Sequence, residues 1–117
     1  MVASITYLGN NQFQMKIADK TVSASRTYLL HIPNAGRTTA EWIVEAFTNT
    51  NTQTQVSLPT FQPITLSDCA ASVNGTAGSI TQNGGQPINM VDNNGNVLVS
   101  PQNLNQAGTS FQVALST

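Results

Sequence analysis

The chain has 117 residues and a formal net charge of −1, and only 8% of its residues are charged. This length is enough for one domain with a core but not for two. With only four cations, the chain has no basic surface for a nucleic acid and no polybasic signal for a membrane. We therefore expect it to bind neither a nucleic acid nor a membrane.

Other features of the composition narrow the class of protein further. Uncharged Asn, Gln, Ser and Thr supply most of the polarity, and a surface hydrated by such groups depends little on ionised carboxylates. It suits an acidic, extracellular environment, so we expect a secreted protein. Residues 1–5 lack the charged start and long apolar stretch of a signal peptide, so that signal would lie upstream. No apolar run approaches the roughly 20 residues of a membrane helix.

The first third of the chain predicts an antiparallel hairpin followed by a longer strand. Residues 4–8 and 12–18 alternate in polarity around Gly9-Asn10-Asn11, a typical turn sequence. The alternation places Phe13, Met15 and Ile17 on one face. Asp19-Lys20 then turns the chain into an extended run over residues 21–32. The residues of this run that we expect to be buried are Val22, Ala24 and Tyr28-Leu29-Leu30.

The rest of the chain predicts short strands between polar turns and no long helix. Residues 48–55 and 74–86 are rich in small polar residues and are predicted to be mostly loop. Strands are expected at residues 64–66, 88–91, 96–99 and 110–115, and residues 68–73 fit either a strand or one helical turn. About seven short strands indicate an antiparallel β-sandwich. We therefore predict a single all-β domain over residues 1–117.

Single cysteine and histidine residues leave little scope for metal or thiol chemistry. Cys69 has no second cysteine to form a disulfide, and we interpret it as a small buried apolar residue. His31 ends an extended run before Pro33 and has no second ligand nearby, so we interpret it as a surface residue. No metal site and no cofactor are expected.

Residues 38–47, TTAEWIVEAF, contain the only two glutamates and the only tryptophan. The spacing of Thr38 and Glu41 fits a capping box, so the local pattern alone leaves helix and strand equally open. The strand-rich surroundings favour a strand, in which Glu41 and Glu45 share one face with Ile43. Their carboxylates would then stand about 13 Å apart. This is too far for a shared-proton dyad or a glycosidase pair, so either glutamate would need a different kind of partner.

The run AEWIVE, residues 40–45, resembles the active-site strand of the glutamic peptidases, the eqolisin family. The hairpin before it and the segments after it also resemble the family's strands in order. Those later segments are Leu58-Pro59-Thr60-Phe61, Pro63-Ile64-Thr65-Leu66, Val97-Leu98-Val99 and Ser110-Phe111-Gln112-Val113. The resemblance covers nearly the whole chain, but only the C-terminal half or somewhat more of the family's domain. It implies an all-β fold and a peptidase acting on polypeptides at acid pH.

The resemblance also implies roles for particular residues. Glu41 matches the glutamate that serves as general base to a water molecule and then as general acid to the departing amine. A glutamate suits this work in acid, where an imidazole would be fully protonated. Trp42 matches a packing residue behind it, and Glu45 matches a second acid of the family without an assigned role. Glu41 is therefore the candidate catalytic residue, with Glu45 second, and no substrate-binding residue is assigned.

One essential part of the family's site is unmatched in this chain. The family uses a glutamine from an earlier strand to hold the water and stabilise the oxyanion. Its context is an upstream region rich in glycine and tryptophan, which is not found here. The glutamines that lie in other contexts are Gln12, Gln14, Gln53, Gln55 and Gln62. The chain alone is therefore expected to be a poor or inactive peptidase.

Two expectations about partners and function follow from this gap. Half of a sandwich would leave unpaired strand edges and an uncovered apolar face, so we expect self-association or a complementing N-terminal chain. The alternative function is a non-catalytic β-sandwich module for binding or assembly. Without the resemblance, the residues favour that alternative, because two glutamates on a strand commonly form a solvated face.

Overall fold

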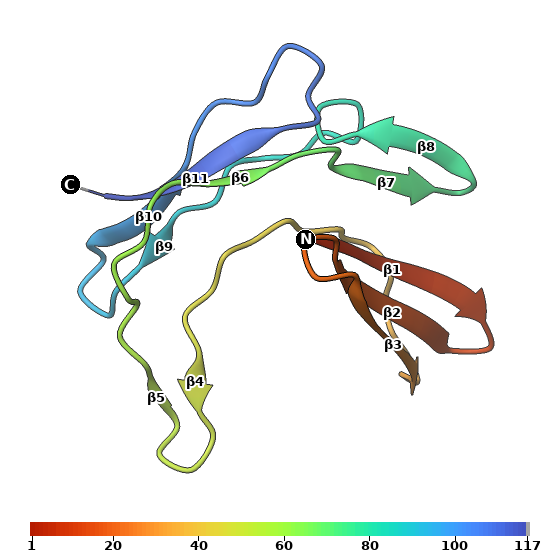
Figure 1. The fold of residues 1–117 in the computed structure, drawn as a ribbon, viewed down its shortest axis with the longest axis horizontal. Helices are drawn as coiled ribbons and strands as arrows, with labels where there is room; N and C mark the ends of the chain where they lie inside the picture. The colour runs from red at the N-terminus through yellow and green to blue at the C-terminus, as the bar shows by residue number, and fades with distance from the viewer. Residues whose placement is uncertain (117) are drawn as a thin grey trace. The chain divides into compact units, whose positions relative to one another are not determined.

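The computed structural model describes residues 1–116 and shows an all-β chain (Figure 1). It contains no helix in that range, and every strand pair is antiparallel. The strands are β1 (Val2–Gly9), β2 (Gln12–Asp19), β3 (Ala24–His31), β4 (Thr48–Asn49), β5 (Thr54–Gln55), β6 (Ile64–Leu66), β7 (Ala70–Val73), β8 (Thr76–Ser79), β9 (Met90–Val91), β10 (Val97–Pro101) and β11 (Phe111–Leu115). The predicted all-β, antiparallel class is confirmed. In the described residues no helix is long and apolar enough to span a membrane.

The chain divides into two compact units, Met1–Thr39 and Ala40–Thr117. The first holds a three-stranded sheet in the order β1-β2-β3. The second holds a four-stranded sheet in the order β6-β11-β10-β9 and the two-stranded pairs β4-β5 and β7-β8. One domain across residues 1–117 stays a prediction.

The hairpin predicted in the first unit is present. Asn10 and Asn11 both have positive φ, 50° and 60°, as the tight turns that match strand twist require. The ladder then aligns Tyr7 with Phe13, and their ring centroids lie 5.1 Å apart. The next strand begins at Ala24, later than predicted. The Asp19 carboxylate accepts a hydrogen bond from the Thr21 N–H at 2.8 Å and stabilises a turn at the start of the predicted strand.

One face of this sheet is apolar and open. Residues paired directly across antiparallel strands share a face. The apolar residues that the register brings together are Ala3, Ile5, Tyr7, Phe13, Met15, Ile17, Tyr28 and Leu30, which we call the apolar face of β1–β3. None of residues 1–39 is buried, and Ile5 remains 69% exposed. The predicted burial of Val22, Ala24, Tyr28, Leu29 and Leu30 is therefore wrong, because the unit by itself is a single-layered sheet and has no interior.

The second unit contains every buried residue of the described chain. These are Cys69, Ser79, Ile80, Val99, Gly108 and Val113. Val113, on β11, pairs with Ile64 on one side and with Pro101 on the other, at the centre of the four-stranded sheet. The interpretation of Cys69 as a buried residue is confirmed, and burial raises the pKa of its thiol.

Loops far apart in sequence join around this core. The Cys69 N–H donates to the Thr109 carbonyl, and the Ile80 N–H donates to the Gly108 carbonyl, both at 2.9 Å. The Asn105 side chain accepts from the Thr109 N–H at 2.8 Å and so holds the loop closed. Gly108 has φ +69°, and a side chain there would collide with Thr81. This close approach explains why only glycine fits.

The remaining predictions for this unit are largely confirmed. The hairpin around Asn94-Gly95 forms between β9 and β10, with Gly95 at φ 85°. Residues 68–73 contain a strand, β7, rather than a helical turn. The loop prediction for residues 74–86 missed β8, although Asn74-Gly75 (φ 52° and 82°) is a hairpin signal of the same type. Residues 48–55 are exposed throughout and carry only the two-residue strands β4 and β5.

Candidate active site

The glutamate segment, residues 40–47, is neither a helix nor a paired strand. It runs as an irregular trace into β4 (Figure 1). The helical alternative is excluded. The prediction that the segment is a strand of a sheet is also wrong, because within residues 1–116 no strand forms backbone hydrogen bonds with residues 40–46. The first such bond joins the Val56 N–H to the Phe47 carbonyl at 2.7 Å.

The side chains of this segment nevertheless alternate as predicted. Glu41, Ile43 and Glu45 are exposed, and the residues between them, Trp42 and Val44, are half-buried. This period of two in exposure is the one that the alternation of a strand predicts. Both glutamates and Ile43 are therefore open to solvent.

The glutamates have no polar partners in the described part of the chain. Neither carboxylate of Glu41 or Glu45 takes part in a hydrogen bond or an ion pair among residues 1–116. His31, the last residue of β3, is exposed. Over the same range no group of three or more His, Cys, Asp or Glu side chains could hold a metal ion. The chemistry available to this segment is therefore that of carboxylates open to water.

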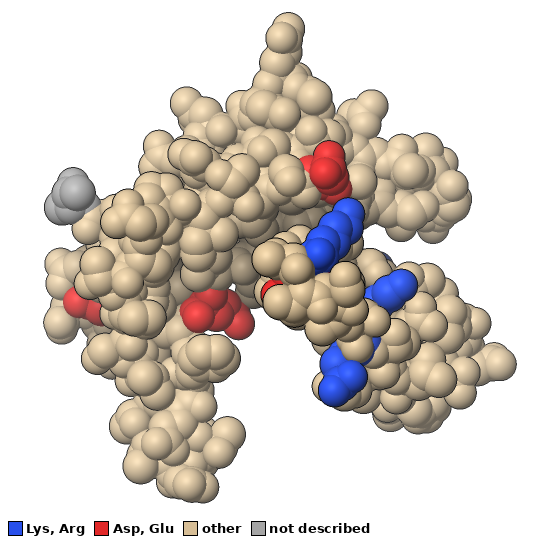
Figure 2. Space-filling model, in the orientation of Figure 1, with Lys and Arg blue, Asp and Glu red and all other residues tan. Residues whose placement is uncertain are grey.

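Charge is divided unevenly between the two units. All four cations, Lys16, Lys20, Arg26 and Arg37, lie in residues 1–39, where Asp19 is the only acid, giving a net charge of +3. Residues 40–117 contain four acids and no Lys, Arg or His, giving −4. Most of the surface in Figure 2 is uncharged, so these few groups dominate the local field. The glutamate segment thus belongs to a unit that attracts cations.

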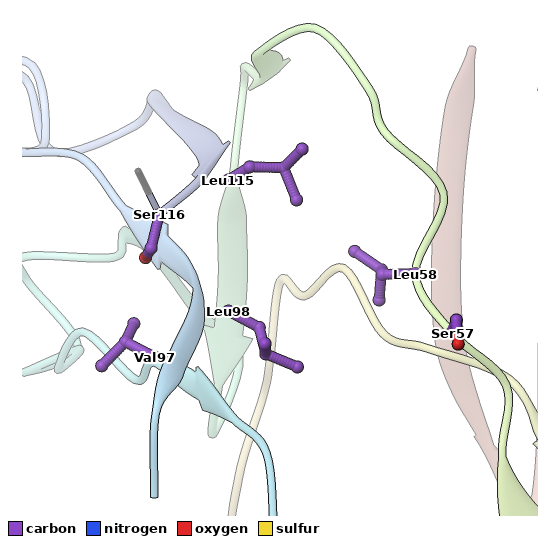
Figure 3. Close-up of a pocket in the computed structure, with 6 residues that line it drawn as sticks. All are labelled: Ser57, Leu58, Val97, Leu98, Leu115 and Ser116. Atoms are coloured by element: carbon purple, nitrogen blue, oxygen red, sulfur yellow. The ribbon is translucent and has the colours of Figure 1, made fainter.

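A hollow of about 390 Å³ lies against β10 and β11, the two central strands of the four-stranded sheet (Figure 3). It is lined by Ser57, Leu58, Val97, Leu98, Leu115 and Ser116. The side chain of Leu58 points toward Leu98 and Leu115. The lining holds no ionisable side chain, so this hollow can receive an apolar group but cannot move a proton. Alternation in residues 96–99 and 110–115 predicts strands without showing which loop approaches them, so this hollow could not be found from the sequence.

The fold defines the class of protein. It matches the crystal structure of aspergilloglutamic peptidase from Aspergillus niger with a TM-score of 0.81 and 19% sequence identity, over 98% of this chain and 65% of that one. At this identity the match shows the fold, and the predicted β-sandwich class is confirmed. The chain thus spans 65% of the length of that peptidase.

The family follows from the sequence. The model of the Peptidase A4 family matches residues 1–113, and the chain belongs to this family. The resemblance to glutamic peptidases noted at residues 40–45 is thereby confirmed. No curated protein matches the sequence. The roles of Glu41 and Glu45, and the position of the chain within the C-terminal portion of the family's domain, stay predictions.

Proposed function

We propose that this chain is the part of an acid endopeptidase that carries the catalytic glutamate, Glu41. The observation that carries the proposal is an exposed glutamate on a non-helical segment, in a chain of the Peptidase A4 family. A general base must be reachable by both water and substrate. The exposure of Glu41 supports this role, and a buried or helical glutamate would have opposed it.

The proposed reaction is hydrolysis of a peptide bond by water. The Glu41 carboxylate takes a proton from the water as its oxygen attacks the carbonyl carbon. The tetrahedral intermediate collapses as the C–N bond breaks, and the protonated Glu41 returns its proton to the departing amine. The oxyanion needs a hydrogen-bond donor. No glutamine of this chain matches the family's oxyanion donor, so we propose that the donor comes from outside this chain.

The same proposal extends to partners and location. The substrate would be a polypeptide, and either a complementing N-terminal chain or a second copy would complete the site. The open apolar face of β1–β3 supports such association, since an exposed apolar area of this kind promotes it. The small number of charges supports a secreted protein that works in acid.

Cleavage of an unfolded protein between about pH 2 and 5, a window set around the ordinary pKa of glutamic acids, tests the proposal. The chain and its Glu41→Gln variant are compared, with Glu45→Gln as the matched control. Because the oxyanion donor is missing from this chain, we expect only weak cleavage. This cleavage should resist pepstatin-type inhibition and fall by at least about 100-fold in Glu41→Gln, because the amide cannot accept the proton. Glu45→Gln should retain most of it.

Equal cleavage by Glu41→Gln and the unmodified chain would contradict the role of Glu41. No cleavage by any of the three proteins would favour the alternative function, a non-catalytic module for binding or assembly. That alternative is also supported by the first unit, whose apolar face is open and whose residues take no part in the proposed chemistry.

A further inference from the structure

Three Asn-Gly pairs occur in this chain, all in turns of the second unit. They are Asn74-Gly75, Asn83-Gly84 and Asn94-Gly95. Such a pair is chemically labile, because glycine has no side chain to hinder the approach of its backbone nitrogen to the asparagine side chain. The three glycines have positive φ, 82°, 70° and 85° in that order, and each has open space within 4 Å of where a Cβ would lie. Free space is therefore common to all three pairs, and hydrogen bonding distinguishes them.

Hydrogen bonds hold both reacting groups of Asn83-Gly84. The Asn83 side-chain amide donates to the Gly78 carbonyl at 3.1 Å and to the Ser79 carbonyl at 3.0 Å. The Gly84 N–H donates to the Thr81 carbonyl, also at 3.0 Å. The two groups cannot approach each other until these bonds break, so this pair should be protected.

The backbone of Asn94-Gly95 is held by one residue, Asp92. Its carbonyl accepts from the Gly95 N–H at 3.0 Å, and its carboxylate accepts from the Asn94 N–H at 2.8 Å. The same carboxylate accepts from the N–H and the side chain of Asn96 at 2.8 and 2.9 Å, which closes the loop. The Gly95 nitrogen is thus engaged, and this pair should also react slowly.

The remaining pair, Asn74-Gly75, forms the tip of the β7–β8 hairpin (Figure 1). Residues 72–77 are all exposed, and the last paired residues before the tip are Val73 and Thr76. Within residues 1–116 the Asn74 side chain and the Gly75 N–H take part in no hydrogen bond. Both reacting groups therefore lie in water at a hairpin tip, where a chain is most easily altered.

We propose that Asn74 is a site of spontaneous modification, at which its side-chain amide is lost and an acid is formed. The Gly75 nitrogen gives up its proton and attacks Cγ of Asn74. A bond forms between that nitrogen and Cγ, the bond from Cγ to Nδ2 breaks, and ammonia leaves with the proton. Water then opens the cyclic imide at either carbonyl and gives aspartate or isoaspartate. The reaction needs only water, and it does not depend on the proposed function.

The modification changes the hairpin in two ways. Residues 70–79 contain no ionisable side chain, so the new carboxylate is the first charge on the hairpin and joins four acids in residues 40–117. Isoaspartate also adds a methylene group to the main chain, which disturbs the pairing of Val73 with Thr76. Because attack requires a deprotonated Gly75 nitrogen, the reaction accelerates as the pH rises. The hairpin thus records the time that the protein spends outside acid.

Peptide mapping of the full chain by mass spectrometry tests the proposal. The folded protein is incubated in mildly alkaline and in mildly acidic buffer, and a third sample is unfolded in alkaline guanidinium chloride. In the folded alkaline sample, Asn74 should react at least about tenfold faster than Asn83 or Asn94, whose hydrogen bonds must break first. The three rates should converge in guanidinium chloride, since each pair consists of the same two residues. Isoaspartate should form far more slowly in acid.

Two variants identify the cause. Asn74→Gln keeps an amide, but its longer side chain closes a ring much more slowly. The acidic species that ion exchange separates from the incubated chain should therefore be largely absent in this variant. Asp92→Ala removes the carboxylate that holds the Asn94 loop. It should raise the rate at Asn94 several-fold and leave the rate at Asn74 unchanged.

The proposal would be overturned by equal rates at the three pairs in the folded protein, or by a faster reaction at Asn83 or Asn94 than at Asn74. The same preference for Asn74 in guanidinium chloride would also overturn it, since neighbouring residues and not the fold would then select the site. Isoaspartate formed as fast in acid as in alkali would exclude the proposed route. Peptide-bond cleavage is measured separately, so failure of the proposed function would leave these results unaffected.

Discussion

The two units differ in how strand length relates to burial. The first unit has three strands of eight residues each and no buried residue. The second has strands of two to five residues and all the buried residues described. Long strands thus arise from strict local alternation and tight turns. Burial arises from distant loops that meet, as at Cys69 with Thr109 and Ile80 with Gly108.

This difference predicts that the two units respond differently to the same kind of substitution. The second unit should lose stability when its close contacts are disturbed. The first unit should lose little stability when its exposed apolar side chains are shortened, because these side chains form few contacts within the unit. Three matched pairs of substitutions, one member in each unit, test this contrast.

The largest effect is expected for glycine to alanine substitutions with positive φ. Gly108→Ala should lower the free energy of unfolding by about 3 kcal/mol, combining left-handed strain with a collision against Thr81. Gly9→Ala should cost only about 1 kcal/mol, since φ is +93° but nothing lies within 4 Å of the added Cβ. Urea denaturation measures both. Equal losses at the two sites would mean that backbone strain accounts for both and that the contact with Thr81 adds nothing.

The next effect concerns apolar side chains. Val99→Ala removes two methyl groups from a residue that is 3% exposed and should cost about 2 kcal/mol. Ile5→Ala, at 69% exposure, should cost less than about 0.5 kcal/mol. In size-exclusion chromatography the unmodified chain should associate as its concentration rises, and Ile5→Ala should weaken this association while Val99→Ala should not.

A clean monomer at moderate concentration would contradict association through the apolar face of β1–β3. A large stability loss in Ile5→Ala would instead show that another surface already covers this face in solution.

The smallest effect is a pH dependence of the two acid-capped turns. Hydrogen bonds from the Asn96 side chain, and then from the Asn96 and Asn94 N–H groups, hold the pKa of Asp92 below its usual 3.8. The Thr21 N–H similarly lowers the pKa of Asp19. A carboxylate with a lowered pKa stabilises the fold above about pH 4 and loses this contribution as the pH falls through the folded-state pKa.

The urea midpoint should therefore fall between pH 5 and pH 2, and Asp92→Asn should reduce this fall, because the amide keeps an acceptor oxygen but does not titrate. Asp19→Asn should reduce it less, since the Asp92 carboxylate accepts three hydrogen bonds at 2.8 to 2.9 Å and Asp19 accepts one. An unchanged pH profile in Asp92→Asn would assign the acid sensitivity elsewhere.

Local sequence patterns predicted the local structure well. Alternation and Asn-Gly or Gly-Asn-Asn turns identified the β1–β2 and β9–β10 hairpins, and the same pattern identified β11. The family was also predicted, because AEWIVE is a specific run of residues. The alternating exposure of Glu41, Ile43 and Glu45 followed directly from a period of two.

Properties that depend on distant partners were not predictable in this way. Tyr28 and Leu29 look like core residues, yet burial requires a second layer that their own strand does not specify. Residues 40–47 have the alternation of a strand, yet pairing requires a neighbour. The strand β8, in contrast, could have been predicted, since Asn74-Gly75 is a typical hairpin turn. It was overlooked because small polar residues around the turn also suit a loop.

The β4–β5 hairpin is a suitable place to modify the chain without disturbing its core. Its turn, residues 50–53, is fully exposed and is held mainly by local hydrogen bonds such as that from the Asn51 N–H to the Asn49 side chain at 2.9 Å. Exposed tips of this kind tolerate insertions and are where proteases first nick a chain. An affinity tag or new chain termini could be engineered there while the four-stranded sheet keeps its buried valines.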